Sequence, residues 1–270
     1  MKLAFSNLAW PAEDDRTLLP ELPELGFASL EVAPTRLWSD PLAQDDDAVA
    51  AVRARIEGAG LRIVALQSLL FQRPELQLFG DAASRQGLHD HLVGMARLAS
   101  KLGATRLVFG SPGNRRRGDL PVDRADEIAV EVFSRLGAAA ADLGVCFCIE
   151  ANPVDYRCDY LTDAVASTAF VHAVDSPGVR LHLDTACMAM AGDDAAERII
   201  AGADVLAHVH ASAPQLGAVL PGGLVEHDVV ADALRTVEYD GHVSVEMLAQ
   251  ADDVTGAVRR TADFVRKTYG

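Results

Sequence analysis

Four residues of the types that bind metals or transfer protons follow short apolar segments at regular intervals. They are Glu150 in FCIEANP, Asp184 in LHLDTA, His210 in HVHAS and Glu246 in SVEML. Consecutive members are 34, 26 and 36 residues apart, and each interval is about the length of one strand-plus-helix unit. If the apolar segments are parallel strands, the four side chains stand at the same edge of the sheet and converge.

Three carboxylates and an imidazole in an apolar environment would be costly to bury as unpaired charges. A divalent cation removes this penalty. Oxygen ligands with one imidazole suit Mn²⁺, Mg²⁺ or Co²⁺ and also admit Zn²⁺. Any one of the four residues alone could be a salt-bridge partner or a helix-capping acid. The hypothesis of a metal site therefore depends on the whole set.

The elements that must position these residues are short apolar runs separated by helical patterns. Most runs are continuously apolar, as expected for strands buried on both faces of a parallel sheet. Eight alternating βα units favour a single closed (β/α)8 TIM barrel over an open doubly wound sheet. No glycine-rich phosphate loop follows any run, which disfavours nucleotide binding. The predicted strands are 2–7, 28–33, 61–68, 105–110, 145–150, 179–184, 205–210 and 242–247.

Helical patterns fill the intervals between the predicted strands. Two long connections, 69–83 and 111–122, follow the third and fourth strands, on the face that carries the chemistry in such barrels. The predicted helices are 14–25, 43–59, 84–102, 123–143, 161–175, 193–201, 227–238 and 252–268.

Two further histidines, His182 and His208, lie two residues before Asp184 and His210. Since the period of a strand is two, each histidine shares a face with the residue that follows it. We expect both to point into the barrel one layer below the metal. They would act there as hydrogen-bond partners of the metal ligands or as satisfied core histidines. We expect His227, at the start of a predicted helix, to be structural.

The length and composition fit one globular domain over 1–270. The 270 residues are half hydrophobic and carry a net charge of −15, which makes nucleic acid a poor partner. The sequence lacks an apolar stretch of about 18 residues, and its N-terminal apolar run is too short for a signal peptide. These features predict a cytoplasmic protein with no membrane partner. Four cysteines without a CxxC pair are expected to be reduced thiols.

Several phrases together resemble the xylose-isomerase-like TIM-barrel superfamily of sugar phosphate isomerases/epimerases, which includes the D-tagatose and D-psicose 3-epimerases. These phrases are CIEANP, LHLDT, HVHAS and PGGLVEHDVVADALRTVEYDGHVSVEM. The resemblance covers essentially the whole chain, and YDGHVSVEM is its most specific part. It implies a divalent metal held by Glu150, Asp184, His210 and Glu246, with Glu150 and Glu246 as the acid/base pair. By analogy it also implies a homo-oligomer formed through the outer helices.

The segments SNLAW, EVAPTRLW, LQSLLFQRPELQLFG and VFGSPGNR resemble a subgroup associated with bacterial carbohydrate biosynthesis. They bring polar side chains to the mouths of the first four strands, either to bind substrate or to fix loops. An anionic or phosphorylated sugar would be bound by an arginine, because a guanidinium can bind an oxyanion bidentately. The polar groups are Asn7, Glu31, Gln67, Asn114 and Arg115, and the candidates for the anion are Arg36 and Arg115.

Two positions depart from the epimerase pattern. The epimerases have a histidine three residues after the metal-binding aspartate, and this chain has Cys187 there. They also have an arginine after the metal-binding histidine, and ASAPQLG contains none. Both residues of the family contact substrate oxygens, so their absence counts against ketohexose epimerase activity but leaves the metal site unchanged. Cys187 is expected to line the pocket as a small side chain.

The leading hypothesis is a metal-dependent isomerase or epimerase that acts on a carbohydrate through an enediolate. A dehydratase or lyase that acts on an oxidised sugar or cyclitol shares the first half of this reaction and stays open. A metal-dependent apurinic endonuclease would need histidines at the third and fourth strand ends, which read LQSLLF and VFGSPG. A non-catalytic sugar-binding barrel is disfavoured by the complete set of four ligands.

Overall fold

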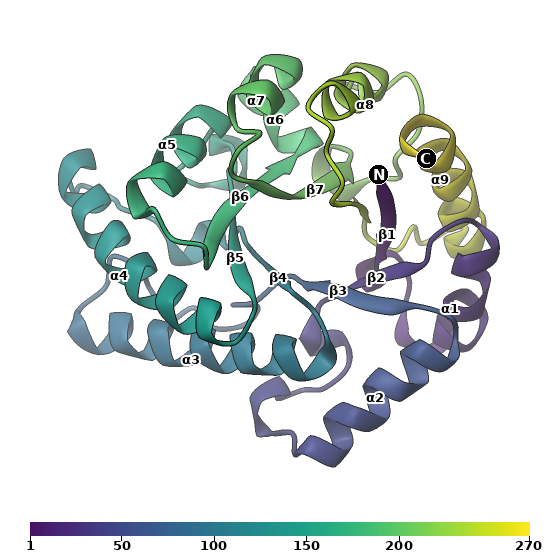
Figure 1. Cartoon of the computed structure of the whole chain (residues 1–270), viewed down its shortest axis with the longest axis horizontal. Coiled ribbons are helices and arrows are strands. Elements are labelled where there is room, and N and C mark those ends of the chain that lie inside the picture. The colour runs from purple at the N-terminus through teal and green to yellow at the C-terminus, as the bar shows by residue number, and fades with distance from the viewer.

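Eight parallel strands form a closed barrel in the computed structural model, which describes all residues 1–270. The strands follow one another around the barrel in chain order, and β1 closes against β8 (Figure 1). All eight predicted strands are confirmed, each within two residues at either end. They are β1 (Lys2–Ser6), β2 (Ser29–Val32), β3 (Arg62–Leu66), β4 (Arg106–Phe109), β5 (Cys146–Glu150), β6 (Val179–Asp184), β7 (Leu206–Ser212) and β8 (His242–Glu246).

The helices form a ring outside the strands (Figure 1). The eight predicted helices are confirmed with ends that move by up to three residues. They are α1 (Asp15–Glu24), α2 (Asp46–Gly58), α3 (Ala82–Leu102), α4 (Val122–Asp142), α5 (Ala164–Val174), α7 (Ala195–Ala201), α8 (His227–Thr236) and α9 (Val254–Tyr269).

The starts of α2 and α5 are later than predicted, because an aspartate caps each helix. The side chain of Asp45 accepts a hydrogen bond from Ala48 N, and that of Asp163 accepts one from Ala166 N. Such a cap satisfies a backbone donor that has no partner inside the helix, and so fixes where the helix begins.

The prediction missed one short helix, α6 (Thr185–Ala191). It begins directly after β6 without a connecting loop, and its sequence TACMAMA has too few residues to show a helical period. Its first turn is capped by Asp184, one of the predicted metal ligands, whose Oδ1 accepts from Cys187 N at 2.7 Å. The missed helix is therefore part of the local structure that positions this ligand.

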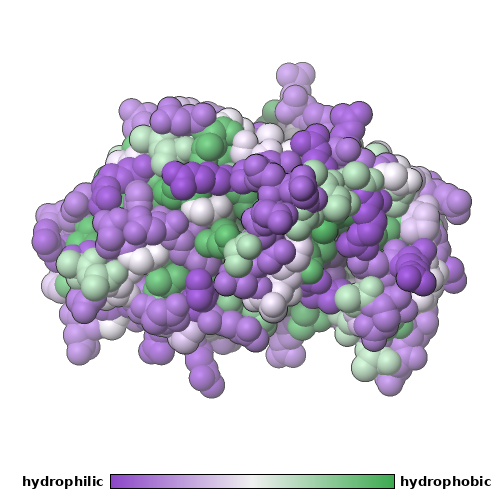
Figure 2. Space-filling model, turned by 90° about the horizontal axis from the view of Figure 1, so that it is seen from below, coloured by the Kyte–Doolittle hydropathy of each residue, from purple (hydrophilic) through white to green (hydrophobic).

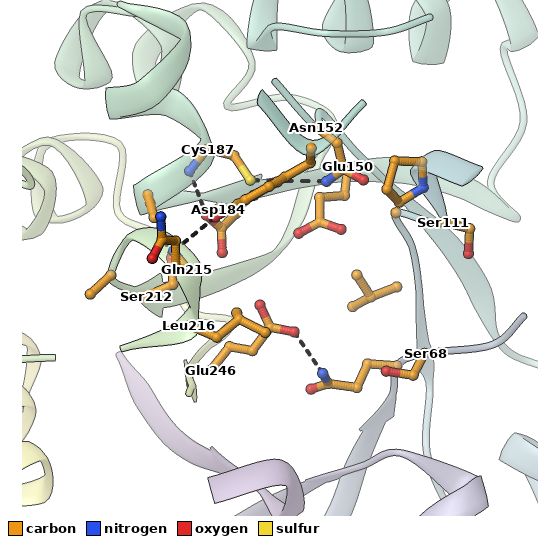
Figure 3. A pocket seen from close by; sticks show the side chains of 17 residues that line it. Ser68, Ser111, Glu150, Asn152, Asp184, Cys187, Ser212, Gln215, Leu216 and Glu246 are labelled. Atoms are coloured by element: carbon orange, nitrogen blue, oxygen red, sulfur yellow. Dashed lines mark hydrogen bonds between the residues drawn. The ribbon is translucent and has the colours of Figure 1, made fainter. Parts of the chain in front are cut away.

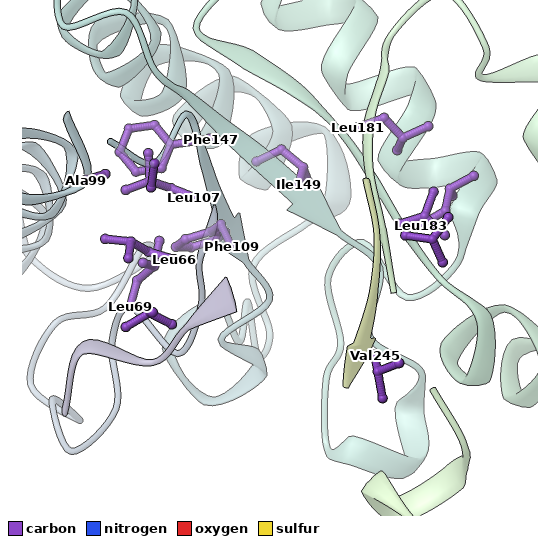
Figure 4. Close-up of a cluster of buried hydrophobic side chains, with 14 of the residues drawn as sticks. Leu66, Leu69, Ala99, Leu107, Phe109, Phe147, Ile149, Leu181, Leu183 and Val245 are labelled. Atoms are coloured by element: carbon purple, nitrogen blue, oxygen red, sulfur yellow. The ribbon is translucent and has the colours of Figure 1, made fainter. Parts of the chain in front are cut away.

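The strands alternate between apolar side chains that face the helices and polar ones that face the barrel interior. Leu181 and Leu183 on β6 and Val245 on β8 belong to the large apolar layer between strands and helices (Figure 4). The residues between them point inward, as the period of two requires. The register places Asp184 beside His210 and His182 beside His208. The interior of this barrel is thus unusually rich in ionisable groups.

The outer surface is mostly polar. In the face seen in Figure 2, hydrophilic residues predominate and apolar residues occur in small separate groups. No helix combines the length and the apolar character needed to cross a membrane.

Candidate metal centre and its cavity

The four predicted ligands meet at the C-terminal ends of β5 to β8. The Nδ1 atom of His210 lies 3.3 Å from Glu246 Oε2, 3.7 Å from Asp184 Oδ2 and 4.0 Å from Glu150 Oε1. All three carboxylates turn toward a common space in Figure 3. His210 is completely buried below them, and its Nδ1 has no hydrogen-bond partner. Ligand atoms of Glu150, Asp184 and His210 lie within 4.8 Å of one another, in a group that also includes His182. Glu246 is outside that group and approaches it through His210.

The other ring nitrogen of His210 is held by Glu31, which comes from β2 on the other side of the barrel. His210 Nε2 lies 3.1 and 3.0 Å from the two carboxylate oxygens of Glu31, and His208 Nε2 lies 3.0 Å from Oε2. With Nε2 donating to this carboxylate, Nδ1 is the nitrogen directed at the other three acids. Protein metal sites use this carboxylate–histidine pairing to fix the tautomer and the ring orientation.

Two of the carboxylates have one oxygen fixed by the protein and the other directed toward His210. Asp184 Oδ1 accepts from Cys187 N, so Oδ2 is the atom near His210. Glu246 Oε1 accepts from Gln67 Nε2 at 2.6 Å, so Oε2 is the atom near His210. Both carboxylates are therefore oriented before any ligand binds, which lowers the entropy lost on binding.

The third carboxylate, Glu150, lies against the end of β4 where Gly110 lacks a side chain. A Cβ atom at Gly110 would lie 2.0 Å from Glu150 Oε2, far inside contact distance. The backbone of Gly110 has an ordinary φ, so the need for glycine here is a matter of space alone. This glycine sets the position of Glu150.

Burial and mutual repulsion make these acids poor anions when nothing neutralises them. Burial, with Glu246 and Asp184 nearby, raises the pKa of Glu150 to about 8. Burial and the charge of Glu246 also raise the pKa of Asp184. For His210, burial lowers the pKa, but the Glu31 and Glu246 carboxylates outweigh it and hold the pKa well above its ordinary value. The cluster thus favours a bound positive charge, either a proton or a metal ion.

A cavity of about 400 Å³ opens above the cluster. Glu150, Asp184 and Glu246 form its acidic side, and no lysine, arginine or histidine side chain lines it. Its wall includes Tyr156, whose hydroxyl accepts a hydrogen bond from Gln215 N at 3.0 Å and so joins the loops after β5 and β7. The cavity has the size of a small-molecule site and a strongly negative lining.

Four lining residues that are not glycine have left-handed backbones, in the loops after β3, β4 and β7. Their φ angles lie between 44° and 59°. This conformation is unfavourable for residues with a Cβ, and such strain tends to gather at functional sites. The four residues are Ser68, Ser111, Gln215 and Leu216.

The structure brings two of the six proposed substrate-binding residues, Gln67 and Cys187, into the cavity wall. Burial and the charge of Asp184 raise the pKa of the Cys187 thiol above its ordinary value, so Cys187 is a neutral wall residue rather than a reactive thiolate.

The other four, Asn7, Arg36, Asn114 and Arg115, lie outside the cavity wall. The Oδ1 atom of Asn7 accepts from Ala33 N, and the Arg36 guanidinium donates to the carbonyls of Asn7 and Trp10. Both residues thus join the ends of β1 and β2 to each other.

Asn114 and Arg115 are buried within the loop region. The Asn114 amide donates to the carbonyls of Arg73 and Leu76, which fixes the long loop after β3. Arg115 is completely buried, and its guanidinium reaches only the carbonyl of Leu161, at 3.5 Å. Backbone atoms thus satisfy the polar groups of Asn7, Arg36 and Asn114, whereas Nε and Nη1 of Arg115 are buried without a hydrogen-bond partner.

His182 and His208 lie in the barrel interior, as expected, and are completely buried. His208 bonds to Glu31. Neither ring nitrogen of His182 has a hydrogen-bond partner, and its Nε2 lies 3.8 Å from Glu150 Oε1. Burial lowers the pKa of both rings, so both are neutral. His227 bonds to the Tyr269 hydroxyl at 2.7 Å, between α8 and α9.

Sequence reasoning missed the role of Glu31 as the partner of His210 and did not nominate Asn152 or Tyr156. Glu31 carries a signal, because an acid inside the short apolar strand SLEV must face the barrel interior. Asn152 and Tyr156 follow a predicted ligand in the loop after β5, where sequence alone does not show which side chains face the cavity.

A profile described as the xylose isomerase-like TIM barrel family matches residues 19–268. The chain belongs to this family. It is 24% identical over 238 residues to an L-ribulose 3-epimerase from Methylomonas sp. (strain DH-1), a match that covers 88% of this chain and 79% of that protein.

Solved structures share the whole fold. A D-psicose 3-epimerase from Clostridium cellulolyticum H10, solved with D-tagatose, superposes with a TM-score of 0.81 at 20% identity and covers 100% of this chain and 99% of its own. A 3-keto-D-glucoside 4-epimerase from E. coli gives 0.81 at 18% identity and covers 99% of each chain. At these identities the likeness shows the barrel, and the chemistry must be argued from the site itself.

Proposed function

We propose that this protein is a divalent-metal-dependent isomerase or epimerase that acts on a neutral, unphosphorylated sugar or sugar derivative. The observation that carries the proposal is His210 Nδ1, which has no hydrogen-bond partner and faces three carboxylates at the base of the cavity. The relatives named above act on sugars as epimerases, which agrees with this assignment.

The residues fit a divalent cation. Glu150, Asp184 and Glu246 would supply oxygen ligands and His210 a nitrogen, a set that suits Mn²⁺, Mg²⁺ or Co²⁺. The raised pKa values of Glu150 and Asp184 indicate that the protein alone does not neutralise these charges. When bound, the cation supplies Lewis-acid stabilisation of the negative charge that develops on the substrate's carbonyl and adjacent oxygens.

Glu150 and Glu246 are the proton-transfer groups. Both line the cavity, and they come from β5 and β8, which β6 and β7 separate. One carboxylate takes the proton from the carbon next to the carbonyl, and the electron pair of that C–H bond moves into the enediolate. The other returns a proton to a carbon of the enediolate. Gln67 holds Glu246 in position through its Oε1.

The charge of the lining favours a neutral substrate. A phosphate would face three carboxylates and no cationic side chain, and Coulomb repulsion between partly buried charges is screened less than between exposed ones. Of the two arginines that could have bound an anion, Arg36 donates to backbone carbonyls, and neither Arg36 nor Arg115 lines the cavity. Hydroxyl groups, in contrast, can donate hydrogen bonds to this lining.

The test is solvent exchange in D₂O with Mn²⁺, followed by NMR. The panel contains D-fructose, D-tagatose, D-psicose and L-ribulose, with D-fructose 6-phosphate as the charged comparison. We expect deuterium at a carbon next to the carbonyl of at least one free ketose, and slower exchange with the phosphate. The Asp184→Asn variant should show none. Preferred exchange with the phosphate would overturn the neutral substrate. No exchange with any sugar, in a protein shown to contain metal, would overturn the proposed reaction.

A further inference from the structure

In the side-chain amide of Asn152, the nitrogen has a hydrogen-bond partner and the oxygen has none. Asn152 is buried, and its Nδ2 donates to the carbonyl of Ala151 at 3.0 Å and faces Cys187 Sγ at 3.9 Å. Its Oδ1 has no hydrogen-bond partner. The orientation of the amide follows from Ala151, because turning it over would place two oxygens against each other. Oδ1 is thus a buried hydrogen-bond acceptor without a donor in the protein.

This free oxygen lies on the cavity wall beside Glu150. A Cβ atom at Gly110 would lie 3.2 Å from Asn152 Oδ1 and 2.0 Å from Glu150 Oε2, so the two oxygens share one part of the wall. Figure 3 shows Asn152 next to Glu150 and across from Glu246. A ligand group that reaches Asn152 Oδ1 is therefore close to the atoms on which Glu150 acts.

A second amide has the same arrangement at the other glutamate. Gln67 Nε2 donates to Glu246, and Gln67 Oε1 is buried without a partner. Each of the two proton-transfer glutamates thus has a free amide oxygen beside it. A buried acceptor left without a donor costs about 1–3 kcal/mol. The lining carboxylates cannot satisfy these oxygens when ionised, because they are acceptors themselves.

We propose that Asn152 is a specificity-determining residue, whose Oδ1 accepts a hydrogen bond from a substrate hydroxyl next to the carbon on which Glu150 acts. This inference rests on the proposed function and makes its substrate more specific. The substrate carries a hydroxyl on that neighbouring carbon. An analogue without it leaves Asn152 Oδ1 unpaired, and the site rejects it by about 10- to 100-fold.

The test uses the ketose that exchanges fastest in the panel above and its analogue deoxygenated at the carbon next to the exchanging one. The variants are Asn152→Leu, which keeps the approximate size of the side chain, and Asn152→Ala. The smaller alanine side chain serves as the alternative if leucine does not fit in the wall. The readouts are kcat/KM for both sugars, metal content and thermal unfolding. The wild type should prefer the hydroxylated sugar by about 10- to 100-fold.

In both variants we expect kcat/KM for the hydroxylated sugar to fall by about that factor, while the value for the deoxy analogue changes by less than about threefold. Metal content should stay at the wild-type level. A merely structural residue would lower both sugars together, and that result would overturn the inference, as would unchanged discrimination. Absence of exchange in the wild type would instead show that the proposed function itself is wrong.

Discussion

The two halves of the barrel mouth differ in chemistry. The strands β5 to β8 carry Glu150, Asp184, His210 and Glu246 at or near their C-terminal ends, whereas β1 to β4 contribute no residue to this set. The first half instead holds the second half in place. Glu31 on β2 fixes His210, Gln67 after β3 fixes Glu246, and Gly110 after β4 leaves the space that Glu150 fills.

This division separates residues that react from residues that orient them. Among the three carboxylates, only Asp184 is oriented by a residue from its own half of the barrel, through the backbone N–H of Cys187 in the first turn of α6. Substitutions in β5 to β8 should therefore abolish the chemistry, and substitutions in β1 to β4 should weaken it in proportion to how far a ligand moves.

The largest effect is expected for Glu246→Gln. The amide keeps the shape of the side chain and can still accept from Gln67, but it cannot take a proton. We expect kcat to fall by about 10²- to 10⁴-fold. Steady-state kinetics with an active ketose measures this. A fall of less than about tenfold would show that Glu246 is not a proton-transfer group.

The next largest effect is expected for Gly110→Ala, a change in the supporting half. The new methyl group would overlap Glu150 Oε2 and displace that carboxylate, and a misplacement of about 1 Å can reduce the rate by about 10²-fold. Gly113→Ala is the matched control, because a Cβ there meets nothing within 4 Å. Equal activity of the two variants would contradict the role given to Gly110.

A smaller effect is expected for Glu31→Gln. The variant keeps one acceptor oxygen but loses the charge that pairs with His208 and His210. We expect the affinity for Mn²⁺ to fall by about 10- to 100-fold, with a lesser change in kcat at saturating metal. Calorimetric titration gives the affinity. Wild-type affinity in a folded variant would mean that Glu31 serves the fold alone.

The smallest effect concerns stability without metal. The pKa of Glu150 is about 8 in the folded protein against an ordinary value of 4.5, so the folded state binds more protons between these pH values. The contribution of Glu150 to the free energy of unfolding is complete below about pH 4.5 and is lost as pH rises through 8. The raised pKa of His210 acts in the same direction.

The metal-free protein should therefore lose stability, by on the order of a few kcal/mol, as pH rises from 5 to 9. Thermal unfolding across this range measures the change. The slope should be smaller in Glu150→Gln and should disappear when Mn²⁺ is present. A melting temperature that does not change with pH would contradict the account of the buried acids.

The strands and the convergence of the four ligands could be predicted from sequence because they depend on local patterns and on the geometry of parallel strands. A run such as LHLD specifies a buried strand, and its last residue must stand at the mouth. The role of Glu31 depends instead on contacts across the barrel, between β2 and β7.

The two arginines show a second reason why the sequence could not predict the whole site. A guanidinium satisfied by loop carbonyls, as in Arg36, has the same sequence signature as one that binds an anion. Only the path of the loop distinguishes the two. For the same reason the sequence did not indicate that the Asn152 amide oxygen faces the cavity beside Glu150.

The central claim is that the four residues on β5 to β8 form one binding site for a divalent cation. Calorimetric titration of chelator-treated protein with Mn²⁺ tests it most directly, with Asp184→Asn as the comparison. Asparagine still caps α6, so this variant removes a ligand charge without removing the cap. We predict one Mn²⁺ per chain in the wild type and none in the variant. No binding to the wild type, or equal binding to both, would contradict the account.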